Sequence, residues 1–344
     1  MKAIVTGGAG FIGSNFLQMV CGTYPEDSWI CLDALTYAGT TASLASLANC
    51  RNFRFVKGDI TDRAFVHELF ASEAPDVVIH FAAETHVDRS LIDPFVFERT
   101  NVGGTITLLE EARIAGVQRF HQISTDEVYG DLPLERPDLF FTESSPLRPS
   151  SPYSASKASA DLFVHAYGRS HGLPVTISRC SNNFGPWSFP EKLIPLTAIR
   201  ALSNKSIPIY GTGLNTRDWL FVSDHCRAID CIVRHGTPGE IYNVCSGRDR
   251  SNLEVVGEIL DLLHKPRSLI TLVADRPGHD KRYAMSAEKL SKTLGWEPQV
   301  PFEEGLRATL RWYVQNRAWW EPLLKGEFRE YFASHYSDSE GFDL

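Results

Sequence analysis

The sequence lacks the features that mark several classes of protein. Its seven cysteines are odd in number and none forms a Cys-x-x-Cys pair, which argues against a disulfide framework and against the common zinc and redox sites. We therefore expect reduced, packed cysteines and no metal. No lysine-arginine run occurs and the formal net charge is −8, so nucleic-acid binding is disfavoured. Anionic ligands must instead be held by local positive charges.

Long hydrophobic runs are also missing. No apolar stretch reaches the ~18 residues that a membrane span requires. No basic and hydrophobic leader precedes the first apolar segment. We expect no membrane association and a cytoplasmic location. The 344 residues, with 43% hydrophobic content, suffice for one large domain or two closely joined ones.

The sequence does contain a glycine-rich turn directly after an apolar N-terminal strand. Gly7, Gly8, Gly10 and Gly13 allow a tight turn and the close approach of a pyrophosphate to the N-terminus of the following helix. A second apolar run ends in Asp33, twenty residues after Gly13. A carboxylate at this place binds ribose hydroxyls and disfavours the extra phosphate of NADP. This pattern predicts binding of NAD.

Further apolar runs alternate with helical patterns along the first half of the chain. The predicted strands are 2–6, 29–32, 53–56, 77–81, 120–124 and 175–178, and the predicted helices are about 62–72, 98–115 and 152–171. Continuous apolar runs are typical of strands buried on both faces. After about residue 180, proline and short apolar pieces recur. The predicted fold is α/β, with a Rossmann-like doubly wound parallel sheet and a smaller C-terminal α/β substrate-binding domain.

Two groups of reactive side chains stand out in this frame. Thr125, Asp126 and Glu127 follow a predicted strand. Tyr153 and Lys157 are four residues apart and so share one face of a helix. Because a neighbouring ammonium stabilises an ionised phenol, Tyr153 is a candidate base for a sugar hydroxyl that Thr125 hydrogen-bonds. A nicotinamide accepts the hydride from the same carbon.

Nine segments in order carry a resemblance to a known family over nearly the whole chain. They are 6–13, 35–39, 82–88, 124–130, 151–157, 181–186, 190–195, 217–219 and 275–280. With these segments the chain resembles the extended short-chain dehydrogenase/reductase family and, within it, the dTDP-glucose 4,6-dehydratases. The related 4-epimerases share the glycine turn and the Tyr-x-x-x-Lys pair. They are not expected to carry the Asp-Glu pair, which is therefore the discriminating feature.

The resemblance implies a reaction and a role for each group of residues. NAD oxidises C4 of the glucose unit, Glu127 takes the proton from C5, and Asp126 protonates the departing C6 hydroxyl, which gives a 4-keto-6-deoxy sugar nucleotide. Thr125, Tyr153 and Lys157 complete the catalytic set. The implied cofactor-binding residues, several of which follow strands, are Gly7, Gly10, Phe11, Ile12, Gly13, Asp33, Leu35, Thr36, Asp59, Ile60, Phe81, Ala82, Ala83, Thr100, Tyr153 and Lys157.

The substrate that the resemblance implies, dTDP-glucose, carries a diphosphate that needs cationic partners. Lys192, Arg217 and Arg276 are the candidates. By the resemblance, the pocket also contains Thr85, Thr125, Asn182, Leu193, Pro208, Tyr210, Asn252 and His279. Thymine differs from uracil by one methyl group, worth only about 1–3 kcal/mol of discrimination, so a UDP-glucose dehydratase stays open. Ala34 and Trp187 depart from the family pattern and leave cofactor affinity and pocket shape open.

The resemblance further implies a homodimer that pairs the long helices near 98–115 and 152–171. We expect an NAD-binding domain of residues 1–180 plus about 219–244, and a nucleotide-sugar-binding domain of about 181–218 plus 245–330. Residues 331–344 form a tail to which no function is assigned. Two other functions stay open: a nucleotide-sugar 4-epimerase, which releases no water, and a dinucleotide-sensing regulator, which needs no complete catalytic set.

Overall fold

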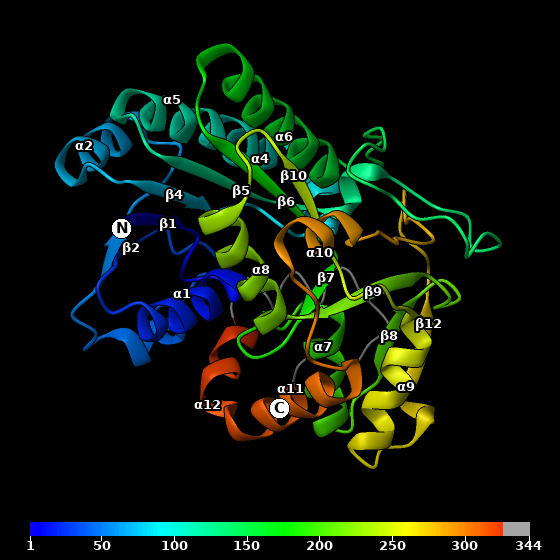
Figure 1. The fold of residues 1–344 in the computed structure, drawn as a ribbon. Coiled ribbons are helices and arrows are strands. Elements are labelled where there is room, and N and C mark those ends of the chain that lie inside the picture. The colour runs from blue at the N-terminus through cyan, green and yellow to red at the C-terminus, as the bar shows by residue number, and fades with distance from the viewer. Residues whose placement is uncertain (326–344) are drawn as a thin grey trace.

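The computed structural model describes residues 1–325, and a seven-stranded parallel sheet forms its centre (Figure 1). The strands are β1 (Lys2–Thr6), β2 (Ser28–Asp33), β3 (Phe53–Lys57), β4 (Val77–His80), β5 (Arg119–Thr125), β6 (Val175–Cys180) and β10 (Ile241–Val244). Their order is β10-β6-β5-β4-β1-β2-β3, with every neighbouring pair parallel. The chain order therefore reverses between β1 and β4, at the switch point beside which such sheets bind ligands.

Helices cover both faces of this sheet. One face carries α1 (Phe11–Thr23), the 3-10 helix η1 (Thr41–Leu47) and α8 (Val222–His235), and the other carries α2 (Arg63–Glu73), α5 (Thr105–Ala115) and α6 (Pro152–His171). The arrangement follows from strands that are apolar on both sides. Ile4 and Val5 are consecutive in β1 and fully buried, Val5 in the core under α1 and Ile4 in the core under α5. Such strands need two covering layers.

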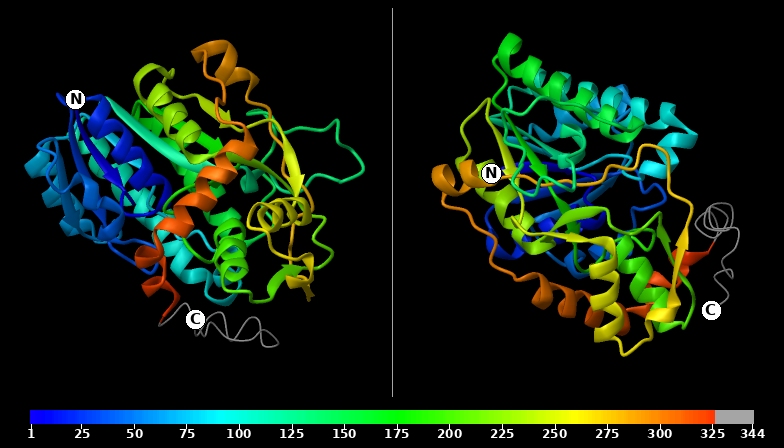
Figure 2. Two further views of the ribbon diagram at one scale, coloured as in Figure 1. Left: turned by 90° about the horizontal axis from the view of Figure 1, so that it is seen from below. Right: turned by 90° about the vertical axis from the view of Figure 1, so that its right-hand side faces the viewer.

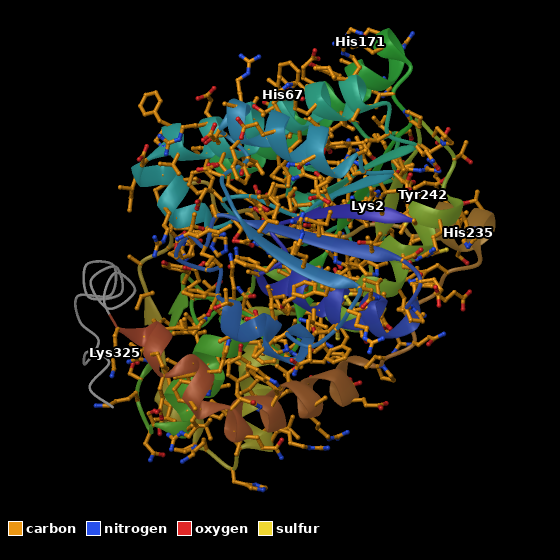
Figure 3. The ribbon with its side chains drawn as sticks, turned by 90° about the vertical axis from the view of Figure 1, so that its left-hand side faces the viewer. Lys2, His67, His171, His235, Tyr242 and Lys325 are labelled. Atoms are coloured by element: carbon orange, nitrogen blue, oxygen red, sulfur yellow. The ribbon has the colours of Figure 1, made fainter. Side chains whose placement is uncertain are left out.

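Short helices lead from β4 into the layer of α5. They are α3 (Val87–Ile92), α4 (Pro94–Phe97) and the π-helix η2 (Glu98–Gly104), while the 3-10 helix η3 (Asp126–Tyr129) follows β5. Figure 3 shows His67 on α2 and His171 at the end of α6 in the outer helical layer, above Lys2 in β1. Tyr242 marks the edge strand β10 in the same view.

The second half of the chain builds a smaller unit below the carboxyl edge of the sheet. It contains the sheet β11 (Asp249–Ser251), β9 (Thr216–Phe221) and β7 (Asn182–Phe184), the parallel pair β8 (Ile207–Tyr210) and β12 (Ile270–Val273), and the helices α7 (Leu193–Leu202), α9 (Asn252–Leu262), η4 (Arg267–Leu269), α11 (Phe302–Gln315), α12 (Arg317–Trp320) and η5 (Pro322–Leu324). The helix α10 (Glu288–Leu294) packs instead against β10 and α8 of the central sheet layer. Figures 1 and 2 show α9 and α11 far from α5 and α6.

The structure confirms the predicted fold class and places all six predicted strands in the central sheet. The strand β10, only four residues long, was not predicted, and the predicted helix 98–115 consists of the π-helix η2 followed by α5. The tail 331–344 lies outside the described residues. Within residues 1–325, no helix combines the length and the apolar character that crossing a membrane requires.

Candidate active site

The turn between β1 and α1 packs backbone against backbone. Gly7 has a φ of +69°, and a Cβ at this residue would lie 2.5 Å from the backbone nitrogen of Ala82, just after β4. A Cβ at Gly13 would lie 2.4 Å from the carbonyl oxygen of Gly7. Only glycine permits both approaches. Gly10 precedes α1 and no described side chain caps that helix, so its first N–H groups are left for another acceptor.

Asp33, at the end of β2, is tied to this turn. Its carboxylate accepts hydrogen bonds from the backbone N–H of Ala9 at 2.9 Å and of Leu35 at 2.8 Å. Burial nevertheless raises the pKa of Asp33, with both bonds acting against the shift. Leu35 has a φ of +55°, so the chain turns sharply after the strand and wraps back toward the carboxylate.

These features fit a bound dinucleotide. An uncapped helix N-terminus attracts phosphate oxygens, and a carboxylate at the end of the second strand binds ribose hydroxyls. The small side chains of Ala82 and Ala83 line the same cavity and allow a flat ring to approach the backbone. The cavity has a volume of about 470 Å³ and extends from the glycine turn toward the second unit.

The Thr-Asp-Glu segment places two carboxylates at the end of β5. Thr125 accepts a hydrogen bond from the N–H of Glu127 at 3.3 Å and donates one to Asp126 Oδ1 at 3.2 Å. Asp126 is only 2% exposed, and its Oδ2 has no hydrogen-bond partner among the described residues. Burial, and then the charge of Glu127, raises the pKa of Asp126 well above its ordinary value.

Glu127 differs from its neighbour in the charges around it. Burial raises its pKa too, but the positive charges of Arg276, Arg217 and Lys192 act to lower it. The two carboxyls therefore share a buried place with unequal tendencies to ionise. A proton is held more readily by Asp126 than by Glu127, which is the division that an acid and a base require.

Tyr153 and Lys157 lie on α6 beside these carboxylates, and both are buried. Lys157 donates a hydrogen bond from Nζ to the carbonyl oxygen of Ile123 at 2.7 Å. Burial lowers the pKa of Lys157. Burial, and then the charge of Glu127, raises the pKa of Tyr153 well above its ordinary value, while a hydrogen bond with Thr125 acts to lower it. In the protein alone the phenol thus stays protonated, contrary to the expected effect of the neighbouring lysine.

The π-helix η2 fixes the start of α6. Asn101, within η2, accepts a hydrogen bond from the backbone N–H of Glu84 at 2.8 Å and donates to the carbonyl of Glu84 at 3.0 Å. It also donates to Ser156 Oγ at 2.8 Å. Because Ser156 precedes Lys157, this one side chain ties the loop after β4 to the helical turn that carries the lysine.

The three predicted cations line the part of the cavity that the second unit forms. Lys192 donates to the carbonyl of Thr85 at 3.0 Å. Arg217 is held by the carbonyls of Thr216 and Asp280, each at 2.9 Å. These carbonyl acceptors carry no charge, so the positive charge of Arg217 remains available to an anion.

Nearly all of the residues predicted from sequence meet in this one cavity. Its lining includes Gly7, Gly10, Phe11, Ile12, Gly13, Asp33, Thr36, Asp59, Ile60, Phe81, Ala82, Ala83, Thr85, Thr100, Thr125, Asp126, Glu127, Tyr153, Lys157, Asn182, Lys192, Leu193, Pro208, Tyr210, Arg217, Asn252, Arg276 and His279. Leu35 is the exception. It does not line the cavity and contributes its backbone N–H to Asp33 instead.

Sequence reasoning missed a group of ionisable residues with buried side chains in the same cavity, namely Glu84, His86, Asp88 and Glu191. Burial raises the pKa of Glu191 to about 7 and lowers that of His86 well below its ordinary value. All four stand inside segments that carried the family resemblance. That membership was the available signal, but it assigned them no role.

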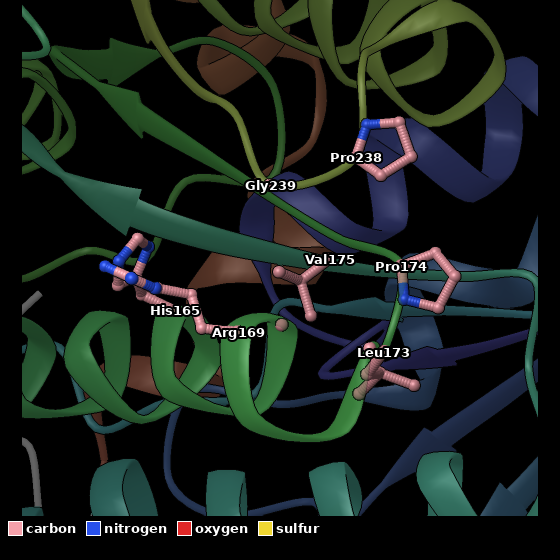
Figure 4. A pocket seen from close by; sticks show the side chains of 9 residues that line it. His165, Arg169, Leu173, Pro174, Val175, Pro238 and Gly239 are labelled. Carbon is pink, nitrogen blue, oxygen red and sulfur yellow. The ribbon is translucent and has the colours of Figure 1, made fainter.

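A second cavity of about 270 Å³ lies at the opposite edge of the sheet, where β6 begins (Figure 4). His165 and Arg169 project from α6 on one side, and Pro174, Val175 and Pro238 lie on the other. None of the predicted site residues is among its lining residues. We assign this cavity no function.

The chain is similar to proteins of known activity. A family model described as GDP-mannose 4,6 dehydratase matches residues 4–309. A dTDP-glucose 4,6-dehydratase of Neisseria meningitidis is 48% identical, covering 95% of this chain and 97% of the relative. A solved structure of the dTDP-glucose 4,6-dehydratase of Streptomyces venezuelae, with NAD bound, is 49% identical with a TM-score of 0.90, covering 94% of this chain and 100% of that one.

Epimerases are more distant neighbours. The UDP-glucose 4-epimerase of Thermus thermophilus, solved in complex with NAD, is 30% identical with a TM-score of 0.85, and the alignment covers 92% of this chain and 100% of the epimerase. The fold is therefore shared with enzymes whose printed names give a different activity. Taken with the family model that matches most of its length, these similarities show that the chain belongs to the GDP-mannose 4,6 dehydratase family.

Proposed function

We propose that this protein is a hydro-lyase that converts dTDP-glucose into dTDP-4-keto-6-deoxy-glucose, with tightly bound NAD as its cofactor. Relatives that carry this activity in their names are 46–50% identical over nearly the whole chain. The observation that carries the proposal is the buried pair Asp126 and Glu127 beside Tyr153. A 4-epimerase, which returns the hydrogen to the same carbon, has no use for this additional acid and base.

The first step takes place at C4 of the glucose unit. Tyr153 would accept the proton of the C4 hydroxyl as a phenolate, which requires the positive charges of Lys157 and of the oxidised cofactor to offset its raised pKa, while Thr125 holds that oxygen. When bound, NAD would supply the hydride chemistry, accepting a hydride from C4 and returning it at C6. The burial of Tyr153 excludes water from this exchange.

The second step removes water across C5 and C6. The new C4 ketone acidifies the hydrogen on C5, which the carboxylate of Glu127 accepts. Asp126 donates its proton to the C6 hydroxyl, which leaves as water. The raised pKa of Asp126 favours its protonated form, whereas the surrounding cations favour the ionised form of Glu127. With the hydride returned at C6, Glu127 returns its proton to C5, and the proton that Tyr153 took from the C4 hydroxyl replaces the one that Asp126 gave up, so the net change is the loss of one water.

Mass spectrometry of the purified protein tests the proposal. The protein is incubated with dTDP-glucose and, separately, with UDP-glucose, first without and then with added NAD. We expect loss of one water from dTDP-glucose. Faster loss from UDP-glucose would assign the uridine nucleotide instead. A C4 epimer without loss of water would indicate the epimerase. A Tyr153→Phe variant that behaves like the wild type would indicate a non-catalytic sensor.

The same resemblance supports a homodimer through α5 and α6. Leu162 and Phe163 on α6 and Ile114 on α5 are large apolar side chains exposed in the single chain. With Phe95 on α4, the most exposed of the group at 78%, they give that layer an apolar outer surface. A second copy of the chain is the occupant that the family resemblance favours. Monomeric mass by light scattering would contradict this proposal.

We also propose the division into an NAD-binding domain, residues 1–180 plus about 219–244, and a nucleotide-sugar-binding domain, about 181–218 plus 245–330. The position of β10 in the central sheet and of β8 and β12 in the smaller unit supports it. For the cell, we propose a cytoplasmic place in deoxysugar biosynthesis, such as the route to dTDP-rhamnose. The unpaired state of all seven cysteines agrees with a reducing compartment.

A further inference from the structure

An ion pair crosses the cavity between the two units. Asp88 lies on α3, after β4, and its Oδ1 accepts a hydrogen bond from Nη1 of Arg276 at 2.9 Å. Its Oδ2 accepts one from the hydroxyl of Tyr210, at the end of β8, at 3.0 Å. Both oxygens of one carboxylate are thus bonded to side chains of the opposite unit. All three residues line the cavity.

The geometry leaves one edge of the Arg276 guanidinium for a ligand. Arginine binds phosphate most specifically through two parallel N–H groups. Asp88 occupies Nη1, whereas Nε is buried and has no hydrogen-bond partner among residues 1–325. An unpartnered buried donor is costly, so this N–H points to an acceptor that arrives with the ligand. The edge formed by Nε and Nη2 is the side of the guanidinium that Asp88 leaves open.

Two opposing effects of Asp88 on a bound diphosphate must be compared. Its negative charge repels the phosphates, and its hydrogen bond fixes the arginine. The carboxylate is mostly buried and its charge is directed into the guanidinium, so the repulsion is largely neutralised within the pair. A half-buried arginine that loses such a partner is left with an uncompensated charge, which favours turning toward solvent. Fixing the arginine is therefore the stronger effect.

We propose that Asp88 is a positioning residue for substrate binding, which holds Arg276 so that its Nε and Nη2 edge meets the diphosphate of the nucleotide sugar. Tyr210 supports the carboxylate from its other oxygen. The inference rests on the proposed function only for the identity of the ligand, a nucleoside diphosphate. Asp88, which belongs to the NAD-binding unit, thereby contributes to the recognition of the diphosphate, which Arg276 of the smaller unit binds.

Isothermal titration calorimetry with dTDP and with thymidine tests this role. In Asp88→Asn we expect the Kd for dTDP to rise by at least about tenfold, because the variant loses one partner of a charged pair. The Kd for thymidine, which has no phosphate, should stay unchanged. In turnover, KM should rise by a similar factor while kcat changes little, since Asp88 touches none of the reacting atoms.

A merely structural role would give a different pattern. It would weaken dTDP and thymidine alike, or lower kcat at constant KM, and either result would overturn the proposal, as would tighter binding of dTDP. Asp27→Asn is the matched control, because Asp27 also forms a 2.7 Å ion pair with an arginine, Arg234, and lies outside the cavity. It should leave both affinities as in the wild type.

A double-mutant cycle with Arg276→Lys isolates the coupling. In the Arg276→Lys background, which has no guanidinium, Asp88→Asn should raise the Kd for dTDP by less than about threefold. The same fold-change for Asp88→Asn in both backgrounds would contradict the proposal. Wild-type protein that binds dTDP but releases no water would contradict the proposed function alone, since the binding comparison would still decide the role of Asp88. Wild-type protein that does not bind dTDP would overturn both.

Discussion

At the scale of single residues, the two carboxylates after β5 carry separate steps. We expect Asp126→Asn or Glu127→Gln to leave the oxidation at C4 intact and to slow the loss of water by about 10²–10⁴-fold, the usual contribution of a general acid or base. Rapid mixing with dTDP-glucose should then show reduced cofactor accumulating in the variants. Variants that lose the C4 step to the same extent would show that the pair does not divide the reaction as we propose.

The raised pKa of Asp126 also has a consequence for stability. In the folded protein, burial and the charge of Glu127 favour the protonated acid, so the folded state holds the proton more tightly than the unfolded state. The cost of ionising Asp126 is absent below its unfolded pKa and grows as the pH rises toward its folded pKa. Asp126→Asn removes this cost.

We therefore expect Asp126→Asn to unfold at a higher urea concentration than the wild type. The gain should be about 1 kcal/mol, the common size for a single stabilising substitution. It should be larger at about pH 8 than at about pH 5. Asp138→Asn is the control, because Asp138 is exposed and its partner Arg136 lowers its pKa. A gain for Asp126→Asn that does not depend on pH would contradict the assigned cause.

Sequence could identify some site residues and not others, for a physical reason. Tyr153 and Lys157 are separated by one helical turn, and Asp126 follows a strand. Local sequence patterns are therefore enough to identify these three residues as site candidates. Asp88 and Arg276 are 188 residues apart in sequence, and their contact depends on how the two units meet. Likewise, burial could not be inferred from the Tyr-x-x-x-Lys spacing, so the expected ionisation of Tyr153 did not anticipate its raised pKa.

At the scale of elements, the glycine turn before α1 is the most constrained segment. Gly13→Ala would place a Cβ 2.4 Å from the carbonyl oxygen of Gly7, so the turn must open. We expect this variant to be purified with less NAD than the wild type and to melt several degrees lower. Gly22→Ala, in the same helix, is the control. A Cβ there meets no atom within 4 Å, and stability should rise by roughly 0.5–1 kcal/mol.

Measurement of cofactor released on denaturation, together with thermal unfolding, separates the two variants. Equal NAD content in Gly13→Ala and the wild type would show that the turn tolerates the methyl group. The contrast depends on position alone, because both substitutions are the same and both lie in α1. The difference between them is whether the helix meets other backbone at that residue.

The length of a helix or strand decides whether it could be predicted from the sequence. The predicted helix 152–171 agrees with α6, where a serine capping box and Pro152 at the first turn mark the start and Gly172 follows the end. The strands β7, β10 and β11 have three or four residues. Such short runs carry no periodicity of their own, and long-range pairing makes them strands.

At the scale of the whole molecule, a monomer leaves the apolar surface of α4, α5 and α6 exposed to solvent. Leu162→Glu, a charge on the exposed side of α6, should convert the proposed dimer to a monomer. Light scattering at working concentration would measure this. Leu272→Glu on β12 is the matched control, since Leu272 is also well exposed and lies on the opposite unit. Loss of the dimer in the control would indicate a different interface.

The bonds of Asp33 restrict how the cofactor preference of this molecule can be changed. A substitution that makes room for the extra phosphate of NADP must remove the carboxylate, which also holds the N–H groups of Ala9 and Leu35. Affinity for NAD and order in the phosphate-binding turn would fall together. An engineered switch to NADP therefore needs at least one further change, to re-anchor the turn after Asp33 has gone.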